Sequence, residues 1–277
     1  MAANTIGLLI AGGLVSGILA GFLGIGGGTV LVPLMVALGF SSQTAVGTSS
    51  LTILITSLSG SIQNWRMGYL SLKRVILLGL PAIVTAQIGA IAANLMPQHV
   101  QLTAFGLLLV SNVYLAGLRK KVTAQQRQKE AGNPDSPSPG AAGQPNTASL
   151  LNPLAARLLT GGIAGLLAGL FGVGGGVIMV PLQILLLGET IKAAVRTSLG
   201  VIVITAISAT VGHAINTNVV FGAGLILGAG GLLGVQISTR FLPKLSEQVV
   251  SLLFRSMLAL LSVYIFWQAW QSYLAQA

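Results

Sequence analysis

The sequence predicts an all-α integral membrane protein built from two inverted repeats of about five apolar segments each. Only 6% of the 277 residues are charged, whereas soluble domains carry about 25%. Uncharged apolar runs recur along the chain, and several reach the roughly 20 residues that a membrane-spanning helix needs. A glycine-rich motif occurs twice, as GFLGIGGGTVLVPL in residues 21–34 and as GLFGVGGGVIMVPL in residues 169–182.

Each glycine motif separates a long apolar run from a short one, and we expect broken or re-entrant helices there. The short runs, about 29–40 and 177–188, would form only ~18 Å of helix, which cannot cross a bilayer core of ~30 Å. A broken helix bares main-chain N–H groups, which a membrane tolerates only around a buried cavity. Two breaks at matching positions of two halves are typical of a transporter's substrate site.

The other apolar runs follow the same order in both halves. In the N-terminal membrane repeat, residues 1–118, and in the C-terminal repeat, residues 153–277, they cover about 5–23, 44–65, 72–95, 100–118, and then 153–171, 193–215, 219–241 and 248–274. Residues 119–152 are rich in Pro, Gly, Ala, Ser and Gln, a composition that predicts a flexible, solvated linker.

Basic residues gather at four of the connections between segments. These are Arg66 with Lys73 and Arg74, the central linker, Lys192 with Arg196, and Arg240 with Lys244. The positive-inside rule places these connections on the cytoplasmic side of the inner membrane and both termini outside. Either every segment crosses, or the first two segments of each half form a re-entrant dip. In both topologies the halves of this multi-pass protein are inverted relative to each other.

Composition also excludes several classes of function. The net charge of +10 is not accompanied by an aromatic–basic surface motif, so we expect no nucleic-acid partner. The absence of cysteine excludes disulfides and thiolate metal sites. No Asp or Glu lies at the centre of a segment, which disfavours cation transport. We therefore expect no enzyme activity, no metal and no cofactor, and a small anion and the lipid bilayer as partners.

The candidate substrate-binding residues form two groups. The first supplies main-chain N–H groups where the short helices begin, since a helix N-terminus carries about +0.5 charge. The second supplies uncharged polar side chains that can donate hydrogen bonds to an oxyanion, although hydrogen bonding between helices is the alternative. The first group is Gly26, Gly27, Gly28, Thr29, Gly174, Gly175 and Gly176; the second is Thr48, Ser49, Asn64, Gln87, Thr197, Ser198, His213 and Gln236.

Three further features have alternative interpretations. His213 is the only histidine well inside an apolar run, and it is either a structural donor or a titrating group that couples transport to protons. Arg196 lies near a segment end, where we interpret it as an interfacial anchor in preference to an anion ligand. Glycines spaced four residues apart predict close helix packing: Gly13, Gly17, Gly21, Gly161, Gly165 and Gly169.

These motifs resemble those of the sulfite exporter TauE/SafE family of membrane permeases. The glycine motifs are followed by AVGTSS at 45–50 and AVRTSL at 194–199, and QIGA at 87–90 is a further match. The resemblance covers the chain outside the linker and implies export of a small sulfur-containing anion. The second half departs from the pattern at Arg196 and at Ser238-Thr239, so the two halves are not expected to have equal roles.

The function that we predict is that of a secondary transporter, an exporter of sulfite or an organosulfonate, with alternating access between the inverted repeats. An anion channel, or a permease for another small oxyanion or a carboxylate, is the alternative. A serine hydrolase using His213 would need a nucleophile motif, and only Ser59-Gly60 is present. A scaffold would have no need of duplicated broken helices, and a homo-oligomer is compatible with all these features.

Overall fold

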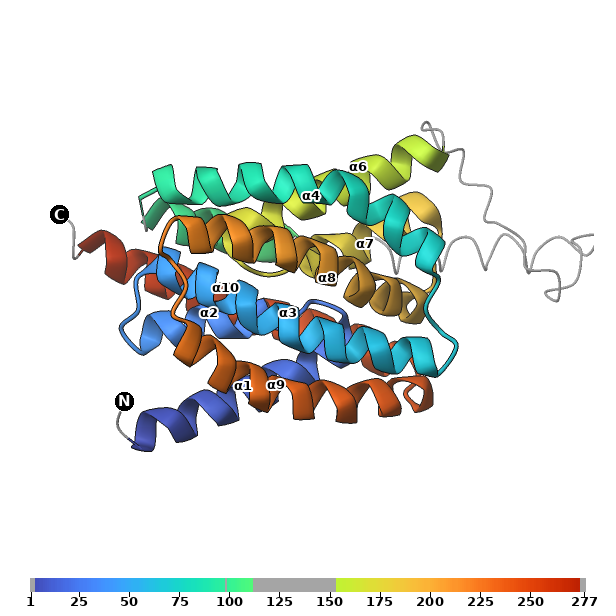
Figure 1. The fold of residues 1–277 in the computed structure, drawn as a ribbon, viewed down its shortest axis with the longest axis horizontal. Coiled ribbons are helices and arrows are strands. Elements are labelled where there is room, and N and C mark those ends of the chain that lie inside the picture. Colours follow the sequence, from blue (N-terminus) through green and yellow to red (C-terminus); the bar gives the residue numbers. More distant parts are fainter. Residues whose placement is uncertain (1–2, 98, 112–152, 275–277) are drawn as a thin grey trace, which may run out of the picture.

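The computed structural model describes residues 3–97, 99–111 and 153–274, which form α-helices joined by short connections (Figure 1). The N-terminal half contains α1 (Ala3–Leu23), α2 (Gly28–Ala37), α3 (Ser42–Arg66), α4 (Leu72–Leu95) and the helix His99–Ser111. The C-terminal half contains α6 (Pro153–Phe171), α7 (Gly176–Leu187), α8 (Ile191–Ile215), α9 (Phe221–Phe241), the short 3-10 helix η1 (Leu242–Lys244) and α10 (Glu247–Leu274). The predicted all-α class is confirmed, and the predicted linker 119–152 lies outside the described residues.

The helices have the length and the surface of a membrane protein. Within the described ranges, seven helices are long and apolar enough to cross a membrane, whereas α2 and α7 have only 10 and 12 residues. Large apolar side chains cover the outside of the bundle: Leu95, Leu260 and Val263 are more than 70% exposed. A soluble protein would not leave so much apolar surface in water, so this surface fits a lipid environment.

The duplication extends to the signals that start the helices. Ser41 caps α3 by accepting a hydrogen bond from the N–H of Thr44 at 3.2 Å, and Thr190 caps α8 by accepting one from the N–H of Ala193 at 3.3 Å. The short helices instead follow Gly27 and Gly175, whose φ angles of 82° and 75° lie in the left-handed region. Only glycine adopts that conformation without strain, which is why each break needs glycine there.

The two sequence halves interleave. Helix α1 packs along α9 and α6 packs along α4, each through its row of glycines. A Cβ atom added to Gly17 would overlap the main chain of Gly231, and one added to Gly165 would lie 2.5 Å from the Cα of Ala82. The close packing that was predicted from the glycine rows is therefore confirmed, and each row binds a helix of the other half.

The contacts also fix the helix directions. Gly47, near the start of α3, packs against Asn218 beyond the end of α8, whereas Gly60 near the end of α3 faces Leu199 near the start of α8. Helices α3 and α8 are thus antiparallel, as Figure 1 shows, and the two halves are inverted. By the same reasoning α1, α3 and α9 are parallel to one another, and α4, α6 and α8 run the opposite way.

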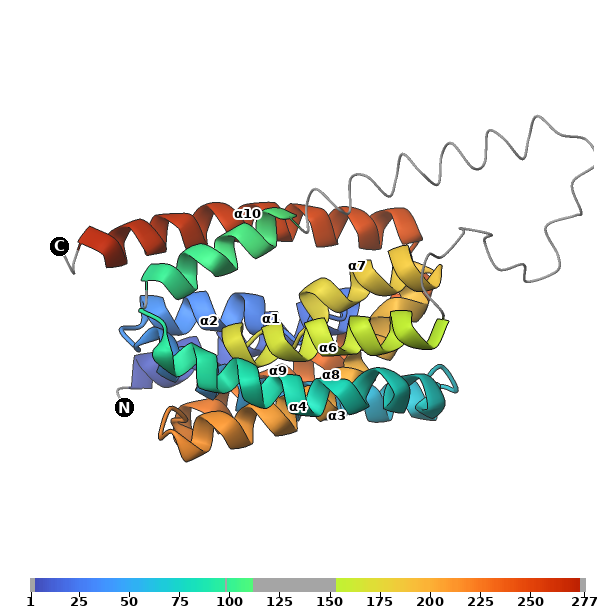
Figure 2. The same cartoon turned by 90° about the horizontal axis from the view of Figure 1, so that it is seen from above.

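The short helices form re-entrant dips. Helix α1 runs parallel to α3, and α2 ends at Ala37, shortly before α3 begins at Ser42. Helix α2 must therefore return to the end of the bundle from which α1 started, and α7 does the same in the other half. Of the two predicted topologies, the structure has the one with the dip. Figures 1 and 2 show α1 starting and α10 ending at one end of the bundle, with the α3–α4, α7–α8 and α9–α10 connections at the other.

Candidate functional site

The two glycine-rich breaks, residues 24–28 (the first crossing) and 172–176 (the second crossing), lie against each other. A Cβ atom added to Gly28 would overlap the carbonyl oxygen of Gly172, and one added to Gly176 would overlap that of Gly24. The two backbones therefore touch directly, in a contact that any side chain would block. Because the same contact occurs in both directions, the two breaks are related by the inverted symmetry of the halves.

The inner residues of the crossings, Gly26 and Gly174, lie at mid-length of the central helices α3 and α8. Ile53 and Ile202 are each the twelfth of the 25 residues in their helix. A Cβ atom on Gly26 would lie 3.0 Å from Cγ2 of Ile53, and one on Gly174 would lie 2.9 Å from Cγ2 of Ile202. Both isoleucines are fully buried. They fill the space beside the crossings, one from each of the two sets of parallel helices.

Main-chain donors at the crossings are left without partners. Neither Gly27 nor Gly175, the residues that precede α2 and α7, makes a side-chain cap, and the hydrogen bonds of the described residues include none donated by the N–H of Gly28 or Gly176. Thr29 is fully buried, and its hydroxyl has no partner among them either. Buried donors are nearly always paired, and the start of a helix attracts negative charge. The uncapped helix starts are therefore chemically suited to a negatively charged group.

Hydroxyl groups fix the carbonyl side of each crossing. Ser49 donates a hydrogen bond to the carbonyl oxygen of Gly172 at 2.9 Å, and Ser198 donates one to that of Gly24 at 2.7 Å. Each serine thus holds the crossing of the opposite half. Two residues that the sequence analysis missed hold the crossing of their own half, since Ser16 donates to the carbonyl oxygen of Gly27 and Thr205 to that of Gly174. A hydroxyl inside an apolar run carries no positional signal, which is why they were missed.

The predicted glutamines lie between helices. Gln87 donates from Nε2 to the carbonyl oxygen and hydroxyl of Ser208, at 2.6 and 3.1 Å. Gln236 donates from Nε2 to the hydroxyl and carbonyl oxygen of Ser59, at 2.7 and 3.3 Å. These bonds join α4 to α8 and α9 to α3. The described hydrogen bonds of both amides go to these serines, so their donors are engaged in helix packing.

The remaining predicted residues lie toward the ends of the central helices. Thr48 accepts a hydrogen bond from the N–H of Val220 at 3.0 Å, and Thr197 is buried in the equivalent position. Asn64 and His213 are eleven residues beyond Ile53 and Ile202, which is about 16 Å along a helix. Thr48 and Thr197 thus adjoin the serines that hold the crossings, whereas Asn64 and His213 lie near opposite ends of the bundle.

His213 makes one directed contact. It is fully buried, and its Nε2 lies 2.8 Å from the carbonyl oxygen of Gly169 in α6. Because a carbonyl oxygen can only accept, this bond requires the proton on Nε2. Nδ1 is buried and has no partner among the described residues. The histidine therefore ties α8 to the end of α6, close to the second crossing, and retains one free ring nitrogen.

Comparison with known proteins agrees with this architecture. The family model described as sulfite exporter TauE/SafE matches residues 9–265. YunE of Bacillus subtilis (strain 168), named as a probable membrane transporter protein, is 27% identical over 273 residues, which cover 94% of this chain and 97% of that protein. A probable membrane transporter protein of Xylella fastidiosa (strain 9a5c) is 26% identical over 271 residues, 96% of each chain. Since the family match includes both halves and both crossings, the protein belongs to the sulfite exporter TauE/SafE family of membrane transporters.

Proposed function

We propose that the protein is a secondary transporter that exports a small sulfur-containing anion, sulfite or an organosulfonate, through the two crossings. The observation that carries this proposal is that the uncapped start of each short helix, Gly28 or Gly176, packs against the glycine-rich break of the other half, at mid-length of α3 and α8. The family description supports sulfite as the class of substrate. The relatives' names support membrane transport without specifying a substrate.

The anion would be bound by main-chain and hydroxyl donors. The N–H groups of Gly28, Thr29 and Gly176 and the hydroxyl of Thr29 are the donors within reach of the crossings. Ser49 and Ser198 hold the neighbouring carbonyl oxygens, so these oxygens are kept from repelling the anion. Partial charges at helix starts attract an anion with less force than a full cation would. This suits a carrier, which must release the anion at the end of each transport cycle.

Alternating access would come from movement between two interleaved sets of helices. One set is α1, α2, α3 and α9, and the other is α6, α7, α8 and α4, because α1 packs on α9 and α6 packs on α4. Each set thus contains helices from both sequence halves. Ile53 belongs to the first set and Ile202 to the second, so rocking one set against the other would withdraw one isoleucine at a time from the crossings.

The basic connections indicate how the protein is oriented in the membrane, and hence the direction of anion transport. The basic connections containing Arg74, Lys192 and Lys244 lie at the end of the bundle opposite the start of α1. The positive-inside rule places that end in the cytoplasm of the inner membrane, together with the linker 119–152. The membrane potential then drives an anion outward with about 2.3 kcal/mol per charge per 100 mV.

A counterflow assay in proteoliposomes tests the proposal. Radiolabelled sulfite should enter in a saturable manner and faster when unlabelled sulfite is present inside. Thr29→Val removes one donor at nearly constant volume and should weaken apparent sulfite affinity about tenfold, the loss expected for one hydrogen bond to a charged group. Gly222→Ala is the control, because a Cβ there meets nothing within 4 Å. Absence of saturable transport for sulfite and for sulfonates would refute the proposal, and currents without counterflow would identify a channel.

A further inference from the structure

We propose that Arg196, Asn64 and Tyr69 form a second anion site, at the end of the bundle that carries the basic connections, which receives the anion before it reaches the crossings. This inference rests on the proposed function. The site lies beside the outer end of the first crossing and is distinct from the helix starts at Gly28 and Gly176, since Asn64 lies eleven residues beyond Ile53 along α3.

Tyr69 joins the other two residues into one cluster. Cζ of Arg196 lies 3.7 Å from the centre of the Tyr69 ring, and the main-chain N–H of Tyr69 donates to the main-chain carbonyl oxygen of Asn64 at 2.9 Å. An independent contact places the same turn against α8, because a Cβ on Gly200 would lie 3.1 Å from Cδ1 of Leu70. The cluster thus consists of the end of α3, the α3–α4 turn and the first turns of α8.

Donors in this cluster lack acceptors. Asn64 is completely buried, and neither atom of its amide has a partner among the described residues. Nε of Arg196 is likewise buried and unpaired there. An aromatic face holds a guanidinium by its flat side, which leaves the N–H groups at its edge free. An oxyanion beside that edge would accept from the guanidinium and from the Asn64 amide together.

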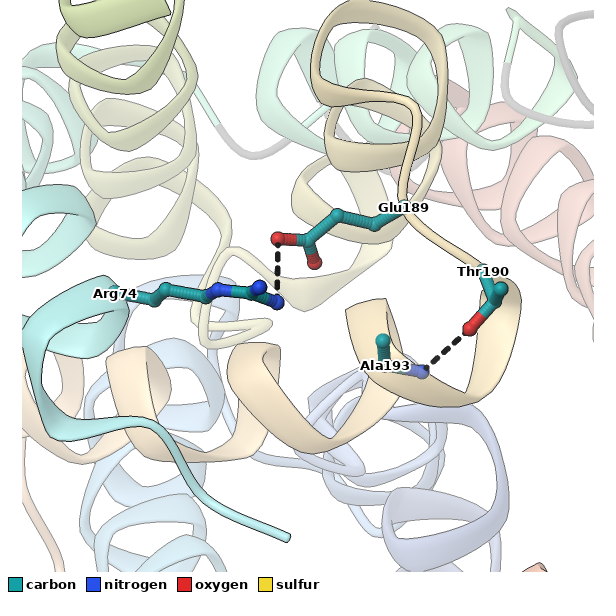
Figure 3. A network of polar contacts seen from close by, with 4 residues as sticks. All are labelled: Arg74, Glu189, Thr190 and Ala193. Carbon is teal, nitrogen blue, oxygen red and sulfur yellow. Dashed lines mark hydrogen bonds and ion pairs between the residues drawn. The ribbon is translucent and has the colours of Figure 1, made fainter. Parts of the chain in front are cut away.

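The carboxylate that is nearest to Arg196 along the chain already has an ion-pair partner. Glu189 lies in the α7–α8 connection and pairs with Arg74 of α4 at 3.3 Å, as Figure 3 shows. Lys192 donates from Nζ to the carbonyl oxygen of Pro243 at 3.1 Å. Within residues 3–97, 99–111 and 153–274, Arg196 has no carboxylate partner. Its positive charge is therefore available to a mobile anion.

The other end of the bundle has the same geometry without the cation. The residues equivalent to Arg196, Asn64 and Tyr69 are Gly47, His213 and Asn218. A Cβ on Gly47 would lie 3.0 Å from Cβ of His213 and would overlap the carbonyl oxygen of Asn218. The inverted halves thus present a guanidinium at one end and a glycine at the other. An anion should therefore bind more tightly when it arrives from the Arg196 end.

The cluster is also close to the first crossing. Val195 precedes Arg196, and its Cα lies 2.7 Å from the position of a Cβ on Gly24. Ser198, two residues after Arg196, donates to the carbonyl oxygen of the same glycine at 2.7 Å. An anion held by Arg196 is thus within about one helical turn of the residues that brace the crossing.

Sided kinetics test the inference. The protein is oriented in proteoliposomes, and the KM for sulfite is measured with sulfite supplied from each side. Arg196→Gly and Asn64→Leu should each raise the KM about tenfold from the Arg196 end, the loss expected for one charged hydrogen bond, and leave the KM from the other end nearly unchanged. Arg196→Lys keeps the charge, so its KM from the Arg196 end should lie between the values of the wild type and of Arg196→Gly. Arg240→Gln, which removes an exposed basic residue at the same end, is the matched control.

Two results would overturn the second site. One is an unchanged KM in folded variants, and the other is an equal rise from both sides. If the wild-type protein transports sulfite but either of these KM results is obtained, the second site is refuted and the proposed function stands. A sulfite-dependent rise in Tm of the purified protein that Arg196→Gly abolishes, while Arg240→Gln keeps it, would support the site. If that rise occurred in a protein that transported no sulfite, the site would stand and the proposed function would fall.

Discussion

Ser198 of α8 donates a hydrogen bond at 2.7 Å to the carbonyl oxygen of Gly24, a residue of the opposite half of the chain. Ser49 makes the equivalent bond to Gly172 at 2.9 Å. Both bonds are fully buried, and they hold the two crossings in register with the central helices. They connect the inverted halves at the point where regular helical hydrogen bonding stops.

Replacing Ser198 or Ser49 with alanine should destabilise the protein. Each substitution leaves a buried carbonyl oxygen without its donor, which costs about 1–3 kcal/mol. Thermal unfolding in detergent should show a lower Tm for both variants. Ser71→Ala is the control, because Ser71 is exposed and its side chain makes no capping bond. Equal Tm values for wild type, Ser198→Ala and Ser49→Ala would mean that the serines do not brace the crossings.

Replacing Gln87 and Gln236 tests whether these glutamines pack helices together or bind the substrate. Their amides bind Ser208 and Ser59 on neighbouring helices, and such bonds contribute about 0.6 kcal/mol each on average in membranes. The variant with Gln87→Ala and Gln236→Ala should therefore have a lower Tm and a nearly unchanged KM for sulfite. A raised KM at unchanged Tm would instead return both amides to the substrate site, as the sequence first indicated.

The two isoleucines at the crossings should become accessible in turn. The chain has no cysteine, so Ile53→Cys and Ile202→Cys each introduce a single thiol for labelling by a membrane-impermeant reagent. Because the isoleucines belong to opposite sets of helices, conditions that favour one open state should speed labelling at one position and slow it at the other. Leu225→Cys, on the exposed surface, should not respond. Parallel changes at both positions would contradict alternating access and favour a continuous channel.

The raised pKa of Glu189 predicts that the stability of the protein depends on pH. Burial raises its pKa above the usual 4.5, and the guanidinium groups of Arg74 and Arg157 oppose this only in part. A raised pKa in the folded state means that the fold favours the protonated carboxyl. Stability is therefore lost as the pH rises from about 4.5 through the raised pKa. Glu189→Gln should remove this loss, because its pair with the half-exposed Arg74 contributes little.

Thermal unfolding over a pH series checks this prediction. The Tm of Glu189→Gln should exceed that of wild type near neutral pH, and the difference should shrink as the pH falls toward 4.5. Lys244→Gln, a change of charge at the same end of the bundle, should not reproduce the pattern. A wild type that is the more stable protein at neutral pH would show that the Arg74–Glu189 ion pair outweighs the burial of the carboxyl.

Much of the fold could be predicted from local sequence signals. Apolar length predicted the segments, and the glycines around Gly24 and Gly172 predicted the breaks, because no other residue type accepts those dihedral angles or that contact. Charge at the connections allowed two topologies, and only helix directions could choose the re-entrant one. The glycine rows predicted close packing, but spacing does not identify a partner, so the interleaving of α1 with α9 did not follow from the sequence.

The candidate site was less predictable, because residue type does not reveal which way a group points. Ser49 and Ser198 were expected to donate to an anion, and they lie at the crossings but donate to carbonyl oxygens. Arg196 was interpreted as an interfacial anchor, and residue type alone could not show that its guanidinium lies over Tyr69 with Nε buried. The repeat alignment contained one signal for it, since a single arginine replaces the equivalent Gly47.

The most direct test of the central claim is an experimental structure determined in sulfite or in selenite, its heavier and electron-rich analogue, beside a matched structure in chloride. The account predicts anion density within hydrogen-bonding distance of the N–H groups of Gly28 and Gly176 and of the Thr29 hydroxyl, with Ile53 or Ile202 displaced. Density that is confined to the amides of Gln87 and Gln236, with the crossings still packed against both isoleucines, would contradict it.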